Sequence, residues 1–375
     1  MLDKHDDLIQ SNNNNLHTIA ALVKKEYLKP DTGHGTPFYP PTFAACKEKN
    51  FDGGYIINNL STKNGSNDIY NECIIDTMGS QANRIEPIFA EDKYRSLIPQ
   101  IVFLAGEDGE DNRQEKHITE VPHRAGDAIF RCSSGYEKLQ EAIFSMIKYN
   151  NHTLLAKLAP TSMFLGAWGS RDKTQFKLPR IVSSTVRAEN VSVLNTGAVY
   201  SPALNYNDLE MLNKQEKIKY QKQLSKQGFS HCPSYGAGGV RASGDIYRLS
   251  SLNLTLIRKL KGSNDKETLK LQRYIFGLTL VYFTATFESE AVDTHLRQGC
   301  NLTLDPDKEN VFEMVQINGT RKNINISHNE AIEYTRKAAK DFENGEDRSF
   351  EFKKDAARKE LEKVHAEDSK NSKKN

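Results

Sequence analysis

This sequence has few cysteines, none of them closely spaced, and only one tryptophan. Its five cysteines stand far apart without a Cys-X-X-Cys pair, which argues against a disulfide framework and against a cysteine-ligated zinc site. Unpaired cysteines favour a reducing compartment, so we expect a cytoplasmic protein. Trp168 is the only tryptophan in 375 residues.

A surplus of one charge and a long apolar run are absent as well. Lysine and arginine number 51 against 49 aspartates and glutamates, a net charge of +2. A nucleic acid or a membrane would therefore have to be recognised by local clusters of charge. The longest apolar run, residues 274–287, is shorter than the roughly 20 residues that span a bilayer, and we expect no membrane partner.

Catalytic and metal-binding patterns are missing too. Gly-X-Ser-X-Gly, His-Glu-X-X-His and the EF-hand loop do not occur, and the histidines are scattered without ligand spacing. Glu288, Glu290 and Asp293 could suggest a metal triad, but the solvated end of a helix explains them as well. No enzyme signature therefore stands out, and we expect no metal and no cofactor.

The predicted elements mix strands and helices without regular βαβα alternation, which indicates an α+β fold. Helices are predicted over 16–28, from Ser80, and over 121–150, 208–227 and, largely buried, 267–287, and strands over 55–58, 73–76 and 101–104. Three regions follow from this order: an N-terminal segment, partly disordered with one helix (1–32), a core (33–318) and a charged, helical, partly disordered tail (319–375).

The most basic segment is residues 168–187, where Trp168 and Phe176 are interleaved with five cations. These cations are Arg171, Lys173, Lys177, Arg180 and Arg187. A projecting loop of this composition suits a single-stranded nucleic acid, because cations neutralise phosphates and a ring can stack on a base. The alternative is an ordinary solvated loop whose tryptophan packs against the core.

A second cluster, residues 234–248, is rich in glycine. Gly238 and Gly239 let the main chain approach a ligand with its N–H groups exposed, and Arg241 and Arg248 supply positive charge. The segment could hold phosphates, although it lacks the ending of a P-loop. A glycine-rich hairpin without a ligand is the alternative.

A third candidate lies at the start of the predicted helix after residue 76. Its first turns present Gln81, Asn83 and Arg84, and amides with an arginine at a helix N-terminus can hold a phosphate or a sugar edge. A capped helix whose Arg84 pairs with Glu86 or another carboxylate is the alternative.

The fourth candidate is residues 121–134. His123 and Asp127 stand four apart on the predicted helix, with Arg124 and Arg131 beside them. Such a pair could act as a general base or as half of a metal site. Since no nucleophile and no second histidine accompanies it, a structural role is the alternative.

Taken together and in order, these segments resemble one family. The motifs are DTMGSQANRIEP, PHRAGDAIFRCSS, APTSMFLGAWGS with KLPRIVSSTVRAENV, GGVRASGDIYRLSSLNLTLIRKL and RYIFGLTLV. They are similar to the backbone subunit of the type I-G (formerly I-U) CRISPR surveillance complex, in the Cas-seven group of the RAMP superfamily. The resemblance extends from about residue 37 to about residue 292.

This resemblance implies an RRM-like, ferredoxin-like antiparallel core with large finger and thumb insertions. It also implies copies of the chain stacked head to tail along a guide RNA (crRNA), which then pairs with target DNA. Further partners would be the other subunits of the effector complex and a separate helicase-nuclease, so no catalysis is expected of this chain. The expected RNA-binding residues are Gln81, Asn83, Arg84, His123, Arg124, Arg131, Trp168, Arg171, Lys173, Lys177, Arg180, Arg187, Gly238, Gly239, Arg241 and Arg248.

Two other functions remain open at this stage. A RAMP endoribonuclease could mature the guide with His123 or His231 as acid or base. A structural protein without RNA is the third possibility, and it predicts that no nucleic acid accompanies the purified chain.

Overall fold

The computed structural model describes residues 5–9, 19–60, 70–106, 113–286 and 294–371. Its centre is an eight-stranded antiparallel sheet in the order β14-β13-β1-β11-β8-β3-β2, with β12 also paired to β1. The strands are β1 Ile19–Pro30, β2 Ile57–Leu60, β3 Tyr70–Asp76, β8 Val182–Glu189, β11 Ile246–Asn253, β12 Leu302–Leu304, β13 Val311–Gln316 and β14 Arg321–Asn323.

Four central strands have the ferredoxin-like arrangement. Along the chain, β1 is followed by helices, then β8, β11, helix α9 (Asp265–Thr284) and β13, which is the β-α-β-β-α-β order of such folds. In the sheet these strands lie in the order β13-β1-β11-β8. The expected α+β class is therefore confirmed, and the large insertions lie between β1 and β8 and between β8 and β11.

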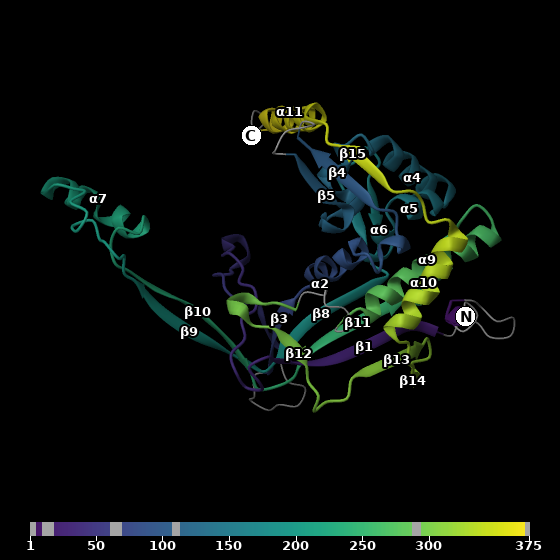
Figure 1. Cartoon of the computed structure of the whole chain (residues 1–375), viewed down its shortest axis with the longest axis horizontal. Helices are drawn as coiled ribbons and strands as arrows, with labels where there is room; N and C mark the ends of the chain where they lie inside the picture. Colours follow the sequence, from purple (N-terminus) through teal and green to yellow (C-terminus); the bar gives the residue numbers. More distant parts are fainter. Residues whose placement is uncertain (1–4, 10–18, 61–69, 107–112, 287–293, 372–375) are drawn as a thin grey trace.

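Helices cover one face of this sheet (Figure 1). Every residue of α9 from Tyr274 to Thr284 is buried, because the helix lies between the sheet and α10 (His328–Phe342). At the crossing, a Cβ on Gly277 would lie 2.8 Å from Thr335 Oγ1, so glycine permits the close approach of the two helices. The rings of Tyr274 and Phe342 stack 4.9 Å apart and close the end of this core.

A second, three-stranded sheet, in the order β15-β4-β5, forms the opposite end of the body (Figure 1). Its strands are β4 Ile101–Ala105, β5 Gln114–His117 and β15 Arg348–Glu351. The other α-helices described outside the arm are α2 Met78–Ile85, α3 Ala128–Arg131, α4 Tyr136–Tyr149, α5 Thr153–Leu158, α6 Pro160–Leu165, α8 Leu254–Lys259 and α11 Lys354–Asn371. Among the described residues, no helix is long and apolar enough to cross a membrane.

The insertion between β8 and β11 is a long two-stranded arm, made of β9 Val191–Tyr200, β10 Cys232–Ala242 and the segment between them. This segment includes α7 Lys214–Lys226. Figure 1 shows the arm projecting from one end of the main sheet with α7 at its far end. The charged helix predicted over 208–227 is therefore confirmed as α7, and it lies at the tip of the arm.

The predicted helix over 16–28 is wrong where the structure describes it, because residues 19–30 are β1. Ile19, Val23 and Tyr27 have helical spacing, but β1 pairs with β11 on one side and with β13 on the other. This pairing outweighs the local preference. The boundary predicted at residue 32 thus separates β1 from the sheet to which it belongs.

Two further expectations need correction. The tail was expected to be charged, helical and partly disordered, but its helix α10 packs on α9 through a buried face that includes Ala331, Ala338 and Phe342. The continuous helix predicted over 121–150 is broken, and the chain instead forms a short turn, η5 Arg124–Gly126, followed by α3 and α4. The acids at 288, 290 and 293 lie outside the described residues.

Candidate nucleic-acid interface

Trp168 is displayed on the surface by a small hairpin. Strand β6 (Ala167–Gly169) pairs with β7 (Phe176–Leu178), and Trp168 lies opposite Lys177. The tryptophan is 65% exposed, and Lys177 Nζ lies 5.9 Å from the centre of its ring. Phe176 points the other way and is buried. The alternative that Trp168 packs in the core is therefore wrong, whereas Phe176 does pack there.

The loop at the end of this hairpin is anchored by a buried acid. Asp172 Oδ1 accepts hydrogen bonds from the Tyr136 hydroxyl (2.9 Å) and from Gln140 Nε2 (2.5 Å), both on α4. Burial, and then the bond to Asp172, raise the pKa of Tyr136 to about 12, so the phenol stays protonated as a donor. The loop is thus held to α4 while its cations remain outside.

We call the exposed residues of this hairpin and its flank the Trp168 surface. They are Trp168, Arg171, Lys173, Lys177 and Arg180. Four cations and one ring face solvent, and Asp172 is the only acid between residues 168 and 180 and is buried. Partial burial lowers the pKa of Arg180, and the nearby charge of Arg124 lowers it further. An anion at this surface would relieve that repulsion between arginines.

The turn η5 supports the hairpin from beneath. A Cβ on Gly126 would lie 2.6 Å from the carbonyl oxygen of Trp168, so only glycine allows this contact. Arg124 is buried and pairs with the buried Glu86 at 2.6 Å. Burial raises the pKa of Glu86, and Arg124 opposes that rise. Arg124 was expected to bind RNA, but it neutralises a core carboxylate instead, while His123 next to it is exposed.

The predicted phosphate site at the start of α2 is largely occupied by protein groups. Arg84 Nε lies 2.7 Å from Asp76, and Gln81 Nε2 donates to the same carboxylate at 2.8 Å. Gln81 is buried, so it offers no group to a ligand. The alternative of a capped helix with a paired Arg84 therefore describes α2 better, with Asp76 as the partner. Asn83 is exposed and accepts from Arg124.

Three other arginines of the predicted set also have partners in the protein. Arg131 forms two 2.8 Å bonds with Glu360 and ties α3 to α11. Arg187 bonds to Glu72 at 2.7 Å and is half-exposed. Arg248 is buried in the main sheet, 3.7 Å from Glu26. Each of these ion pairs helps to stabilise the fold, and a ligand would have to compete with the acidic partner for the arginine.

His123 and Asp127 do not form a catalytic or metal-binding pair on a helical face. His123 precedes η5, and the Asp127 carboxylate caps α3 by accepting from the backbone N–H of Ile129 at 3.0 Å. The structural alternative is therefore correct for Asp127.

The two glycines predicted to cradle phosphate shape the base of the arm instead. The pairing of β9 with β10 shifts between Ala237 and Val240, which indicates a β-bulge. Gly239 has a φ of +102°, and its N–H donates to the Tyr55 hydroxyl at 2.9 Å. A Cβ on Gly238 would lie 2.6 Å from the backbone of Asn195. Of this cluster, Arg241 is the exposed cation.

Residues 22–193 match the protein family described as CRISPR-associated protein GSU0053. Over these residues, which are less than half of the chain, the protein is similar to that CRISPR-associated family. The family is the Cas-seven-like one of type I-G systems, which confirms the resemblance stated from the motifs. The matched segment includes most of β1 and the whole of α2, η5 and the Trp168 surface. A comparison with curated proteins finds no match.

The structure joins three of the four predicted clusters and separates the fourth. The Trp168 surface touches η5 at Gly126, and Arg180 Nη1 lies 3.5 Å from the Met78 carbonyl oxygen of α2. Asn83 and His123 therefore border the same surface. Arg241 lies on β10 at the base of the arm, apart from this group.

Sequence reasoning missed a lysine that lies over two tyrosine rings at β1, and it missed exposed apolar side chains on the arm. Lys25 Nζ lies 4.6 Å from the ring centre of Tyr27 and 4.3 Å from that of Tyr247, on the sheet face opposite the buried Glu26. An alternating pattern would have revealed this face, had residues 16–28 been interpreted as a strand. On the arm, Tyr235 is 77% and Ile218 is 79% exposed, and neither has a motif that would single it out.

Proposed function

We propose that this chain is the guide-RNA-binding backbone subunit of a type I-G CRISPR surveillance complex. Several copies would stack along the RNA and present it for pairing with target DNA. The chain itself would be non-catalytic, and a separate helicase-nuclease would destroy the target.

The observation that carries this proposal is the Trp168 surface. It combines four exposed cations with an exposed ring, and Asp172 and Gly126 fix its backbone. Mobile cations with one stackable ring suit phosphates and the face of any base, but they provide no set of aligned donors and acceptors that would read a sequence. Such a surface supports a grip on the RNA backbone that leaves base edges available for pairing.

The arm supports the expectation of repeated copies. Large apolar side chains lie exposed along it and at its tip, where a monomer gains nothing from them. They include Val193, Val199, Tyr200, Leu209, Ile218 and Tyr235. An arm of this kind can reach RNA or a neighbouring copy in a head-to-tail assembly.

The proposal predicts a uniform loss of RNA affinity when two lysines of the Trp168 surface are removed. Lys173→Ala with Lys177→Ala should weaken binding of two single-stranded RNAs of unrelated sequence to the same extent. Each lost phosphate contact should reduce the slope of log affinity against log salt by roughly 0.7. Fluorescence anisotropy of labelled RNAs over a salt series measures both quantities.

A charge-matched control is available on the exposed side of α10. Lys337→Ala with Lys340→Ala removes the same net charge from exposed positions of α10 and should leave the affinity and the slope nearly unchanged. Equal losses in both double variants would contradict the assignment of the surface, and a loss confined to one RNA sequence would contradict the grip on the backbone. Arg187 is unsuitable for this test, since its removal also breaks its ion pair with the buried Glu72.

A further inference from the structure

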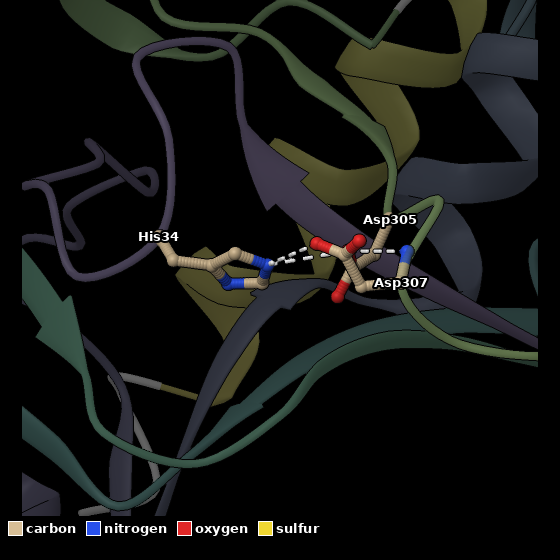
Figure 2. A group of neighbouring side chains, drawn as sticks. All are labelled: His34, Asp305 and Asp307. Atoms are coloured by element: carbon tan, nitrogen blue, oxygen red, sulfur yellow. Dashed lines mark hydrogen bonds and ion pairs between the residues drawn. The ribbon is translucent and has the colours of Figure 1, made fainter.

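A cluster of potential metal ligands lies outside the Trp168 surface, where the end of β1 meets the turn after β12. His34 follows β1, and Asp305 and Asp307 follow β12. Figure 2 shows the His34 ring directed at both carboxylates. The three ligand atoms lie within 4.8 Å of one another. The sequence could not indicate this group, because His34 and Asp305 are 271 residues apart.

The distances within this cluster suit a common metal ion. His34 Nε2 lies 3.2 Å from Asp305 Oδ1 and 4.0 Å from Asp307 Oδ2. Two ligands that each lie about 2.0–2.2 Å from one ion are separated by about 3–4 Å. An ion could therefore replace the hydrogen bond between His34 and Asp305 with small movements of exposed side chains.

One ligand is fixed and the other two can adjust. The Asp305 side chain is only 1% exposed, whereas those of His34 and Asp307 are 56% and 77% exposed. Asp305 Oδ1 also accepts from the backbone N–H of Asp307 at 3.2 Å. A buried carboxylate held in place beside two adjustable ligands is a partly preorganised site.

An independent observation is a small cavity of about 30 Å³ beside the cluster, lined by His34 and Asp305. This volume holds one or two water molecules. A metal ion with three protein ligands needs water in its remaining positions, and the cavity provides the room. The wall also includes Gly244 and Asp245 of the turn that joins the arm to β11.

Two lysines oppose an added cation here. Lys29 Nζ lies 3.8 Å from Asp305 Oδ1, and Lys308 lines the cavity but is paired with Asp245. Lys29 and Lys308 carry two positive charges, and Asp245, Asp305 and Asp307 carry three negative ones. The site is therefore net negative before His34 is counted. Lys29 is the competing cation, because a metal ion and its ammonium group would both be attracted to Asp305.

We propose that His34, Asp305 and Asp307 bind a divalent first-row transition metal ion such as Zn²⁺. An imidazole among the ligands favours such an ion over Mg²⁺ or Ca²⁺, which prefer oxygen ligands alone. The bound ion would link the loop after β1 to the turn after β12, next to the base of the arm. This inference does not depend on the proposed function in RNA binding.

Isothermal titration of the metal-stripped, tag-free full-length chain with Zn²⁺ tests the proposal. We expect one ion per chain and at least about tenfold weaker binding in His34→Ala and in Asp307→Ala, because each removes a ligand. Mg²⁺ should bind far more weakly than Zn²⁺. His123→Ala, which removes an exposed histidine elsewhere, should bind like the unaltered chain.

Lys29→Met distinguishes a metal site from a simple His–Asp pair. Removal of the competing ammonium group should strengthen Zn²⁺ binding several-fold, an effect that a hydrogen-bonded pair without a metal would not produce. The proposal is overturned if Zn²⁺ does not bind, or if His34→Ala and Asp307→Ala bind it as tightly as His123→Ala does. Far-ultraviolet circular dichroism of each variant verifies that the fold is retained.

Discussion

Arginine residues in this protein serve two purposes that the sequence alone does not separate. Arg124 and Arg248 are buried beside Glu86 and Glu26, and burial lowers the pKa of Arg248. Arg171 is exposed on the hairpin that displays Trp168. Loss of one partner of a buried pair costs about 3–5 kcal/mol, whereas loss of an exposed arginine changes stability by less than about 0.5 kcal/mol. Affinity losses in variants of the buried arginines would therefore mix folding with binding.

A buried histidine gives the fold a pH dependence. His328 lies between the Tyr94 hydroxyl and Thr284 Oγ1, each 2.8 Å from a ring nitrogen. Burial, helped by the charges of Lys93 and Lys24, lowers its pKa to about 4. Between about pH 6.5 and 4, the unfolded chain binds a proton that the folded chain does not, so stability is lost as the pH falls through this window.

We expect this histidine to contribute about 1–3 kcal/mol of the stability lost on acidification, after allowance for residual solvent screening. Urea unfolding at a series of pH values between 7 and 4.5 measures the loss. His328→Gln should be less stable at pH 7 but should lose less stability on acidification. An unchanged pH slope in the variant would show that other groups cause the dependence.

For single residues, the sequence showed which side chains could bind an anion, but not which other side chains surround them in the fold. The cations around Trp168 could be recognised because they are neighbours in the chain. The acids that occupy Arg131 and Arg187, Glu360 and Glu72, lie more than 100 residues away in the sequence. Only the folded chain brings such partners together.

Among the elements, the base of the arm depends most on backbone conformation. The bulge at Gly238 and Gly239 allows β10 to contact both Asn195 and Phe38. Gly239 needs its positive φ, and a Cβ there would lie 2.9 Å from the Phe38 carbonyl oxygen. Gly236, three residues before it on the same strand, has nothing within 4 Å of such a Cβ and no left-handed φ.

These two glycines form a matched pair for a stability test. Gly239→Ala should lower the free energy of unfolding by about 1–3 kcal/mol, because alanine is strained at this φ and collides with Phe38. Gly236→Ala should change it by less than about 0.5 kcal/mol. Chemical denaturation followed by circular dichroism compares them, and similar values for both variants would contradict the role given to the bulge.

Local pattern was enough to predict β3, β4, α7 and α9, because each has a strong apolar or charged period of its own. It failed for β1, where apolar spacing fits a helix and the buried Glu26 interrupts the alternation expected of a strand. Glu26 is tolerated there because Lys24, Arg248 and Thr286 surround its carboxylate. Those partners come from β1 itself, from β11 and from the turn after α9, so the strand is specified by the tertiary structure.

For the whole molecule, the near-neutral charge agrees with a subunit that holds a few nucleotides per copy. The cations of the Trp168 surface lie outside the arm, which presents exposed apolar side chains of its own, and the arm itself projects from the body (Figure 1). Similarity to a CRISPR-associated family over residues 22–193 supports work within a larger complex. The central claim is that many copies grip one RNA without regard to its sequence.

The most direct measurement is the composition of the assembly purified from cells that also express a guide RNA. Native mass spectrometry with a denaturing gel and an absorbance ratio gives the copy number and the nucleic-acid content. The account predicts one discrete small RNA with several copies of the chain, whichever guide sequence is supplied. A monomer that carries no nucleic acid and retains no transcript at low salt would contradict it.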